Sequence, residues 1–173
     1  GANVSILGTI NATAATTDSL TITTGAGNVT LGSSVGNLVQ LEDLTIVSAG
    51  ATTLNDTIRV SGNAAGEDLD LDSATDVRLG SDVSLISARD VLLNAVNGQG
   101  HDLTANATLE INLTAGITGV RDVRLTSGST LLLDNTVTAG GDLLANVTTA
   151  ASDITVTAAL TANGLINLDT AGA

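Results

Sequence analysis

The chain lacks Cys, Pro, Met, Lys and all three large aromatic residues. Without cysteine it forms no disulfides and no thiolate metal site. Without proline and without a three-residue glycine period it is not a collagen. Aromatic side chains usually supply the bulk of a wide protein interior. Here Ala, Val, Leu and Ile must fill the interior alone, so we expect a narrow core.

Positive charge is also scarce, because five arginines face 18 acidic residues and the net charge is -13. Such a surface repels nucleic-acid phosphates, so we expect no nucleic-acid partner. No run of about 18 apolar residues occurs, so we expect no membrane insertion. Residues 1–17 lack the basic start and apolar block of a signal peptide, and the chain lacks an initiator Met. We therefore expect a mature product or part of a longer chain.

Short alternating runs make up most of what is present. Apolar residues are 43% of the chain, and Thr, Val and Ile favour extended backbone. Runs such as SLTITT and DLTIV end at GAG and SAGA, where Gly and Ser tolerate turn conformations. The pattern predicts all-β structure, and the helix period is absent throughout.

The runs recur along the chain with a drifting period of about 20 to 25 residues. Related segments start at Ser19 and Asp43 (offset 24), at Gly140 and Ala162 (offset 22), and at Thr75 and Arg121 (offset 46, or twice 23). An acid followed by Leu or Val recurs at Asp102, Asp122 and Asp142, at a constant offset of 20. Two or three short strands per period are typical of one coil of a parallel β-solenoid (β-helix).

A solenoid built from this chain would be a single repeat segment over residues 1–173. About eight coils, stacked at the inter-strand spacing of roughly 4.8 Å, would make a rod roughly 40 Å long. We expect the lumen to hold one file of aliphatic residues per strand position. These are Leu20 and Ile22, Val29 and Leu31, Leu44 and Ile46, Val77 and Leu79, Val83 and Leu85, Val123 and Leu125, and Ile154 and Val156.

An antiparallel β-sandwich is the alternative fold, because its strands also recur at short, regular intervals with turn signals between them. Two features favour the solenoid. Sandwich cores normally carry aromatic residues, which this chain lacks. The repeats also share an order of breaks, which a sandwich does not need.

Two segments carry a resemblance to a known family: GNVTLGSSVGNLVQLEDLTIVSAGATTLNDTIRVSG and VTAGGDLLANVTTAASDITVTAALTANGLINLDTAGA. They resemble the β-strand repeats of filamentous-haemagglutinin-like and autotransporter-like exoproteins of bacteria. The resemblance covers most of the chain and implies a right-handed parallel β-helix, secretion, and a role as stalk or adhesin passenger. Only passenger-type repeats are visible, without the secretion domain or membrane barrel of that family.

The stretch DLDLDSATDVRLGSDVSL is the most acidic part of the chain and the main chemical candidate. If Leu69 and Leu71 face the lumen, then Asp68, Asp70 and Asp72 face outwards in one line, about 7 Å apart. Their carboxylates suit Ca²⁺, although one strand cannot enclose an ion. Acids of an adjacent coil, such as Asp90 or Glu42 and Asp43, would have to stack on them. The alternative is a solvated strand face that also blocks lateral aggregation.

Catalytic motifs are not visible in the sequence. The only histidine, His101 in NGQGHDL, is expected in a solvated turn. Polysaccharide-cleaving β-helices use clustered acids, basic residues and often aromatic sugar platforms, whereas the five arginines here are scattered and rings are absent. We therefore expect no enzyme activity, no catalytic residue and no cofactor apart from the calcium option.

The expected function is that of a non-catalytic structural solenoid outside the cell, as a stalk, adhesin passenger, or cell-surface or biofilm filament. The alternative is a binding module that recognises a host-surface or polysaccharide ligand along one face. Solenoid ends need caps to stay soluble, and both ends of this sequence look like its middle. We therefore expect further coils, or copies of the chain stacked end to end, as partners.

Overall fold

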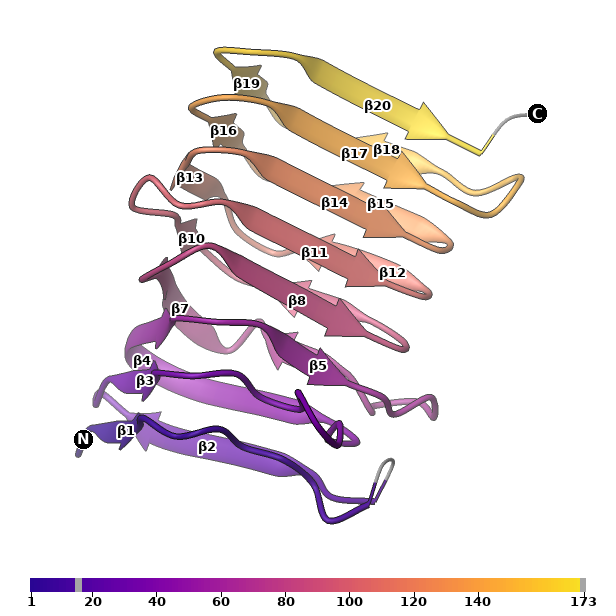
Figure 1. Cartoon of the computed structure of the whole chain (residues 1–173). Coiled ribbons are helices and arrows are strands. Elements are labelled where there is room, and N and C mark those ends of the chain that lie inside the picture. The colour runs from indigo at the N-terminus through magenta and orange to yellow at the C-terminus, as the bar shows by residue number, and fades with distance from the viewer. Residues whose placement is uncertain (15–16, 172–173) are drawn as a thin grey trace.

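A computed structural model describes residues 1–14 and 17–171, and in that part of the chain every regular element is a β-strand. The strands pair in parallel and stack as a β-solenoid of about seven turns. Figure 1 shows the coils rising from the N-terminus to the C-terminus as a single stack. The predicted solenoid is therefore confirmed over the sandwich, with about one coil fewer than expected. Residues 15–16 and 172–173 of the predicted segment lie outside the described residues.

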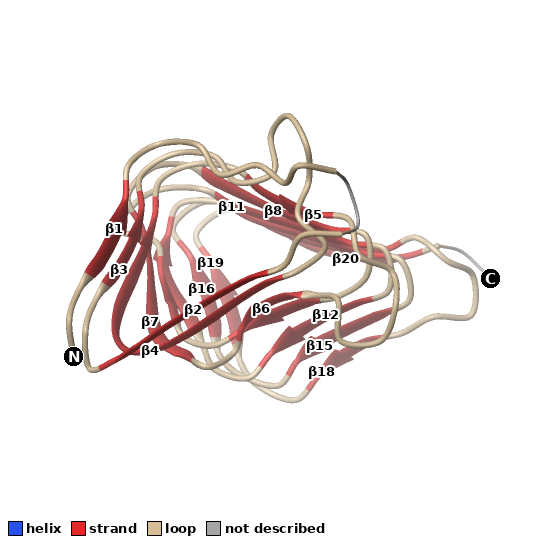
Figure 2. Ribbon diagram, turned by 90° about the horizontal axis from the view of Figure 1, so that it is seen from below, coloured by secondary structure: helices blue, strands red, loops and turns tan. Residues whose placement is uncertain are grey.

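Three faces enclose the lumen, and Figure 2 shows them along the axis as the sides of a prism. Face 1 contains β2 (Leu20–Gly25), the start of β4 (Leu44–Leu54), β6 (Leu69–Leu71), β9 (Val91–Leu93), β12 (Glu110–Leu113), β15 (Thr130–Leu133) and β18 (Ile154–Val156). Face 2 contains β1 (Val4–Ile6), β3 (Val29–Leu31), the end of β4, β7 (Ala74–Leu79), β10 (Val96–Asn97), β13 (Ile117–Val120), β16 (Val137–Ala139) and β19 (Leu160–Ala162). Face 3 contains β5 (Ile58–Val60), β8 (Val83–Ser87), β11 (Leu103–Ala107), β14 (Val123–Ser127), β17 (Leu143–Val147) and β20 (Ile166–Thr170).

The register on face 3 gives the repeat directly. Val83, Leu103, Val123 and Leu143 are successive partners, and the sequence offset between neighbours is 20 at every step. On face 1 the offset is 24 from Leu20 to its partner Leu44, and 25 from Leu44 to Leu69. The predicted period is therefore confirmed together with its drift, and the longer N-terminal coils account for the smaller number of turns.

Alternation within each strand places the aliphatic side chains in the lumen. The expected pairs from Val29 and Leu31 to Val123 and Leu125 are buried. Face 3 also carries small lumen residues, such as Ala105, Ala145 and Ser127, which keep the interior narrow. The two ends of the stack differ, because Leu20 and Ile154 are only partly buried and Val156 is 38% exposed. Among the described residues, Leu20 and Ile154 each have a paired strand on one side only.

Candidate functional sites

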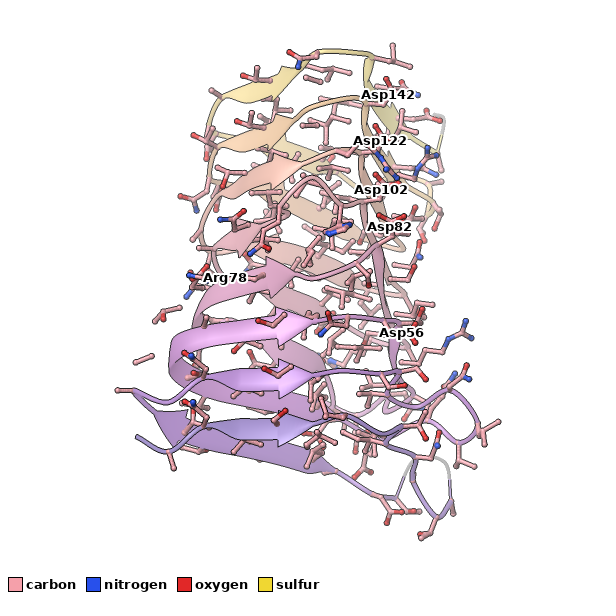
Figure 3. The ribbon with its side chains drawn as sticks, turned by 60° about the vertical axis from the view of Figure 1, so that its left-hand side comes forward. Asp56, Arg78, Asp82, Asp102, Asp122 and Asp142 are labelled. Atoms are coloured by element: carbon pink, nitrogen blue, oxygen red, sulfur yellow. The ribbon has the colours of Figure 1, made fainter. Side chains whose placement is uncertain are left out.

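A ladder of aspartates runs along the corner where face 2 turns into face 3. Asp82, Asp102, Asp122 and Asp142 each immediately precede a face 3 strand, and Figure 3 shows them in one column. The backbone N–H of Asp102 donates to Oδ1 of Asp82 at 2.9 Å, and Asp122 and Asp142 repeat this contact at 3.1 and 2.8 Å. At the end of the ladder, the N–H of Leu165 donates to Asp142.

The column of four aspartates is stable because the hydrogen bonds that they accept are stronger than the repulsion between their charges. Neighbouring carboxylates at the coil spacing repel by about 1 kcal/mol or less in bulk water. A hydrogen bond to a charged group contributes roughly 1.5–3 kcal/mol net. The N–H contacts therefore outweigh the repulsion, and the ladder binds each coil to the next. The regular recurrence of Asp102, Asp122 and Asp142 was visible in the sequence, but their hydrogen-bonding role was not. Asp82, which precedes Val83 and lies 20 residues before Asp102, carries the same signal and was missed.

Arg121 reinforces this corner. Its Nε donates to Oδ1 of Asp102 at 2.8 Å and its Nη2 donates to Oδ2 at 2.5 Å, while Oδ2 of Asp82 accepts from Nη2 at 3.5 Å. This bidentate contact, helped by the N–H of Asp122, lowers the pKa of Asp102. His101 lies in a loop, as expected, and its Nδ1 is 3.7 Å from Oδ1 of Asp82.

We expect Arg121→Gln to raise the pKa of Asp102 towards its ordinary value, because the strongest partner of its charged form is lost. The depressed pKa means that Asp102 stabilises the fold above its unfolded-state pKa. That stabilisation disappears as the pH falls through the folded-state pKa. Carboxyl ¹³C NMR titration measures the change. Arg78→Gln is the control, because Arg78 pairs with Asp76, and an unchanged titration in Arg121→Gln would contradict the assignment.

The predicted calcium residues take three different environments. Leu69 and Leu71 are fully buried, which confirms that the leucines of this stretch face the lumen. Asp70 stands on the outer face of β6 between Thr45 and Leu92, and its Oδ1 accepts the N–H of Asp72 at 2.9 Å. No acid of an adjacent coil is therefore in register with Asp70. The carbonyl of Asp72 accepts from the side chain of Asn94 at 2.7 Å.

Asp68 does have acidic neighbours, as the calcium hypothesis required. Its backbone carbonyl accepts from Leu44, which follows Asp43, and Leu69 donates to the carbonyl of Asp90. The side chain of Glu42 instead accepts a hydrogen bond from the hydroxyl of Ser19 at 3.0 Å. Within residues 1–14 and 17–171, no group of three or more His, Cys, Asp or Glu side chains is arranged to hold a metal ion. The calcium site at Asp68, Asp70 and Asp72 stays a prediction from sequence.

Arg89 instead occupies the space between two of these acids. Its Nε lies 3.0 Å from Oδ2 of Asp90 and 3.2 Å from Oδ1 of Asp68, although Asp68 Oδ1 makes no hydrogen bond to the described residues. Burial and the charge of Asp90 raise the pKa of Asp68, and Arg89 opposes them. Burial also raises the pKa of Asp70. The ionised forms of Asp68 and Asp70 therefore lower the stability of the fold at neutral pH.

We expect Asp70→Asn to stabilise the fold at neutral pH by up to about 0.5 kcal/mol, the usual range for a surface change. A raised folded-state pKa means that ionised Asp70 destabilises the fold at neutral pH. That penalty vanishes below the unfolded-state pKa, while the amide oxygen of Asn still accepts from Asp72. Urea unfolding at pH 7 and pH 3 measures the difference, and an equal gain at both pH values would contradict the charge argument.

Comparison of the sequence with protein-family models, with curated proteins and with solved structures found no match. The fold therefore defines the class, a parallel β-solenoid repeat protein, and the likeness to haemagglutinin-type exoproteins stays a resemblance. In the described part of the chain, no helix is long and apolar enough to span a membrane.

Proposed function

We propose that the chain is a non-catalytic structural segment of an extracellular rod, serving as a stalk, adhesin passenger or cell-surface filament. The observation that carries the proposal is the in-register stack of equal coils on face 3, from Val83 to Leu143. Bending such a stack stretches backbone hydrogen bonds along one side. The aspartate ladder adds a hydrogen bond per coil at the corner.

The charged groups support a structural use. Three of the five arginines, Arg78, Arg89 and Arg121, form ion pairs with aspartates. The ladder carboxylates accept backbone N–H groups of neighbouring coils. Most of these groups therefore bind coil to coil, and we propose no catalytic role and no cofactor.

Stacking on other coils belongs to the same proposal. Among the described residues, strand β20 pairs only with β17, and its lumen-side residues Ile166 and Leu168 are 42% and 43% exposed. An open parallel edge with an apolar row is a template for another strand. We propose that further coils, from a longer chain or from a second copy, cover this edge.

Pulling the two ends apart in a single-molecule force experiment tests the mechanical role. A coil of 20 residues extends to about 70 Å when unravelled and occupies about 4.8 Å in the stack. We expect discrete steps of about 65 Å, each coil resisting separately, because coils contact only their neighbours. Smooth extension at low force would contradict the rod.

Surface labelling of intact source cells tests the location. An antibody raised against the chain should label unpermeabilised cells, along fibres or stalks that project from the surface. Labelling that appears only after permeabilisation would overturn the extracellular part of the proposal and leave the mechanical part standing.

A further inference from the structure

Face 3 carries a shallow hollow on its outer surface, with a volume of about 270 Å³. It crosses three consecutive strands, β14, β17 and β20, at positions that point away from the lumen. The register places the side chains in two columns along the rod axis. The first column is Arg124, Leu144 and Asn167, and the second is Thr126, Asn146 and Asp169.

The polar side chains that line this hollow make no ion pair or hydrogen bond with the residues that the structure describes. Arg78, Arg89 and Arg121 each pair with an aspartate, whereas Arg124 forms no ion pair with the described residues. Among the same residues, the side chains of Asn146, Asn167 and Asp169 make no hydrogen bond. Arg59 also forms no ion pair with the described residues, but it lies on β5 at the other end of face 3. At the hollow, by contrast, an arginine, an aspartate and two asparagines without such contacts meet on adjacent strands.

The mixture of groups indicates the ligand. Arg124 only donates hydrogen bonds, Asp169 only accepts them, and the two asparagine amides do both. A simple anion would be repelled by Asp169, and a simple cation would be repelled by Arg124. Hydroxyl groups donate and accept, so a molecule with several adjacent hydroxyls can satisfy the whole set. Leu144 adds an apolar surface between them, against which the C–H groups of a sugar ring can pack.

The surroundings favour an uncharged sugar. Face 3 is bordered by the aspartate ladder, whose Asp122 and Asp142 directly precede β14 and β17. The chain as a whole carries a net charge of -13. An acidic polysaccharide lying along face 3 would be repelled by both.

We propose that this hollow is a binding subsite for one unit of a neutral polysaccharide that lies along face 3. Its volume is just below the range of about 300–1,000 Å³ that encloses a drug-sized ligand, so it suits a single ring of a longer chain. The two columns continue onto β11 through Thr104 and Asn106, which gives the polysaccharide a path along the rod. The proposal goes beyond the structural role and does not depend on it.

Amide NMR titration of the whole chain with cellohexaose, maltohexaose and mannohexaose tests the site. At millimolar concentration we expect at least one of them to shift signals of β14, β17 and β20. A lost hydrogen bond costs about 1 kcal/mol, so Asn146→Ala combined with Asn167→Ala should weaken binding by roughly tenfold or more. Asn112→Ala is the matched control. Asn112 stands on the outer side of β12 on face 1, away from the hollow and from the path along face 3, so its replacement should leave binding unchanged.

Three results would overturn the proposal. One is the absence of shifts with all three neutral sugars. A second is equal weakening by Asn112→Ala, which would place the contact on another face of the rod. A third is preferential binding of an acidic hexasaccharide of galacturonate. Because the force and labelling experiments use no sugar, the structural role stands or falls separately.

Discussion

Replacing Gly128 by alanine is expected to destabilise the solenoid by about 3 kcal/mol or more, at or above the upper end of typical overpacking costs. Gly128 lies at the corner between β14 and β15, where an added Cβ would overlap the backbone carbonyl oxygen of Thr108 in the preceding coil. The backbone of Gly128 cannot move away from Thr108, because hydrogen bonds tie it to the coils on both sides. The N–H of Gly128 donates to Ala107 at 2.9 Å, and its carbonyl accepts from Thr149 at 3.0 Å.

Urea unfolding followed by circular dichroism measures this loss, and Gly8→Ala provides the control. A Cβ at Gly8 meets none of the described residues within 4 Å, so that variant should stay within about 0.5 kcal/mol of the parent. Equal stability of the Gly128 and Gly8 variants would show that the coils have room to separate at this corner. It would then contradict the close stacking on which the rod depends.

The fold was predictable from sequence because its determinants are local. Alternation assigns successive residues of a strand to lumen and surface in turn, and Leu44, Ile46 and Leu71 are buried as expected. The exposure of Val156 shows that position in the stack, which alternation does not give, also matters. The absence of aromatics indicated a narrow core, and the breaks indicated corners. Each of these predictions can be made without knowing which strands pair.

Pairing itself was only partly predictable, and the errors show why. The segments from Thr75 and Arg121 look like repeats, but β7 lies on face 2 and β14 lies on face 3. Their likeness therefore reflects the general composition of a strand. Near the C-terminus the offset of 22 is also one residue short, because Leu143 pairs with Ile166. A slip of one residue exchanges lumen and surface.

The candidate sites were harder to predict, because they depend on which corners stack. The line of Asp68, Asp70 and Asp72 was expected from alternation, and the outward position of Asp70 agrees with it. Arg89, which lies against Asp68 and Asp90, is distant from Asp68 in sequence and carries no pattern. The residues that line the hollow on face 3 come together only when β14, β17 and β20 stack in register. Only the aspartate ladder left a periodic signal.

Replacing Leu93 by alanine is expected to cost about 2–5 kcal/mol, the range for removing a buried leucine side chain without full collapse. Leu93 is fully buried in β9, in register between Leu71 and Leu113 of the neighbouring coils. The cavity would therefore open in the middle of the stack. Because each coil contacts only its neighbours, this loss weakens the link between the two halves, and the unfolding transition should broaden as well as shift.

Leu92→Ala separates this packing effect from any effect of strand propensity. Leu92 is the preceding residue of the same strand, has the same side chain, and stands on the outer face beside Asp70 and Asn112. Its partly exposed side chain should cost about 1 kcal/mol or less when truncated, with an unbroadened transition. Similar losses in the two variants would mean that strand propensity governs stability. A large loss for Leu93 alone would show that the aliphatic lumen holds the coils together.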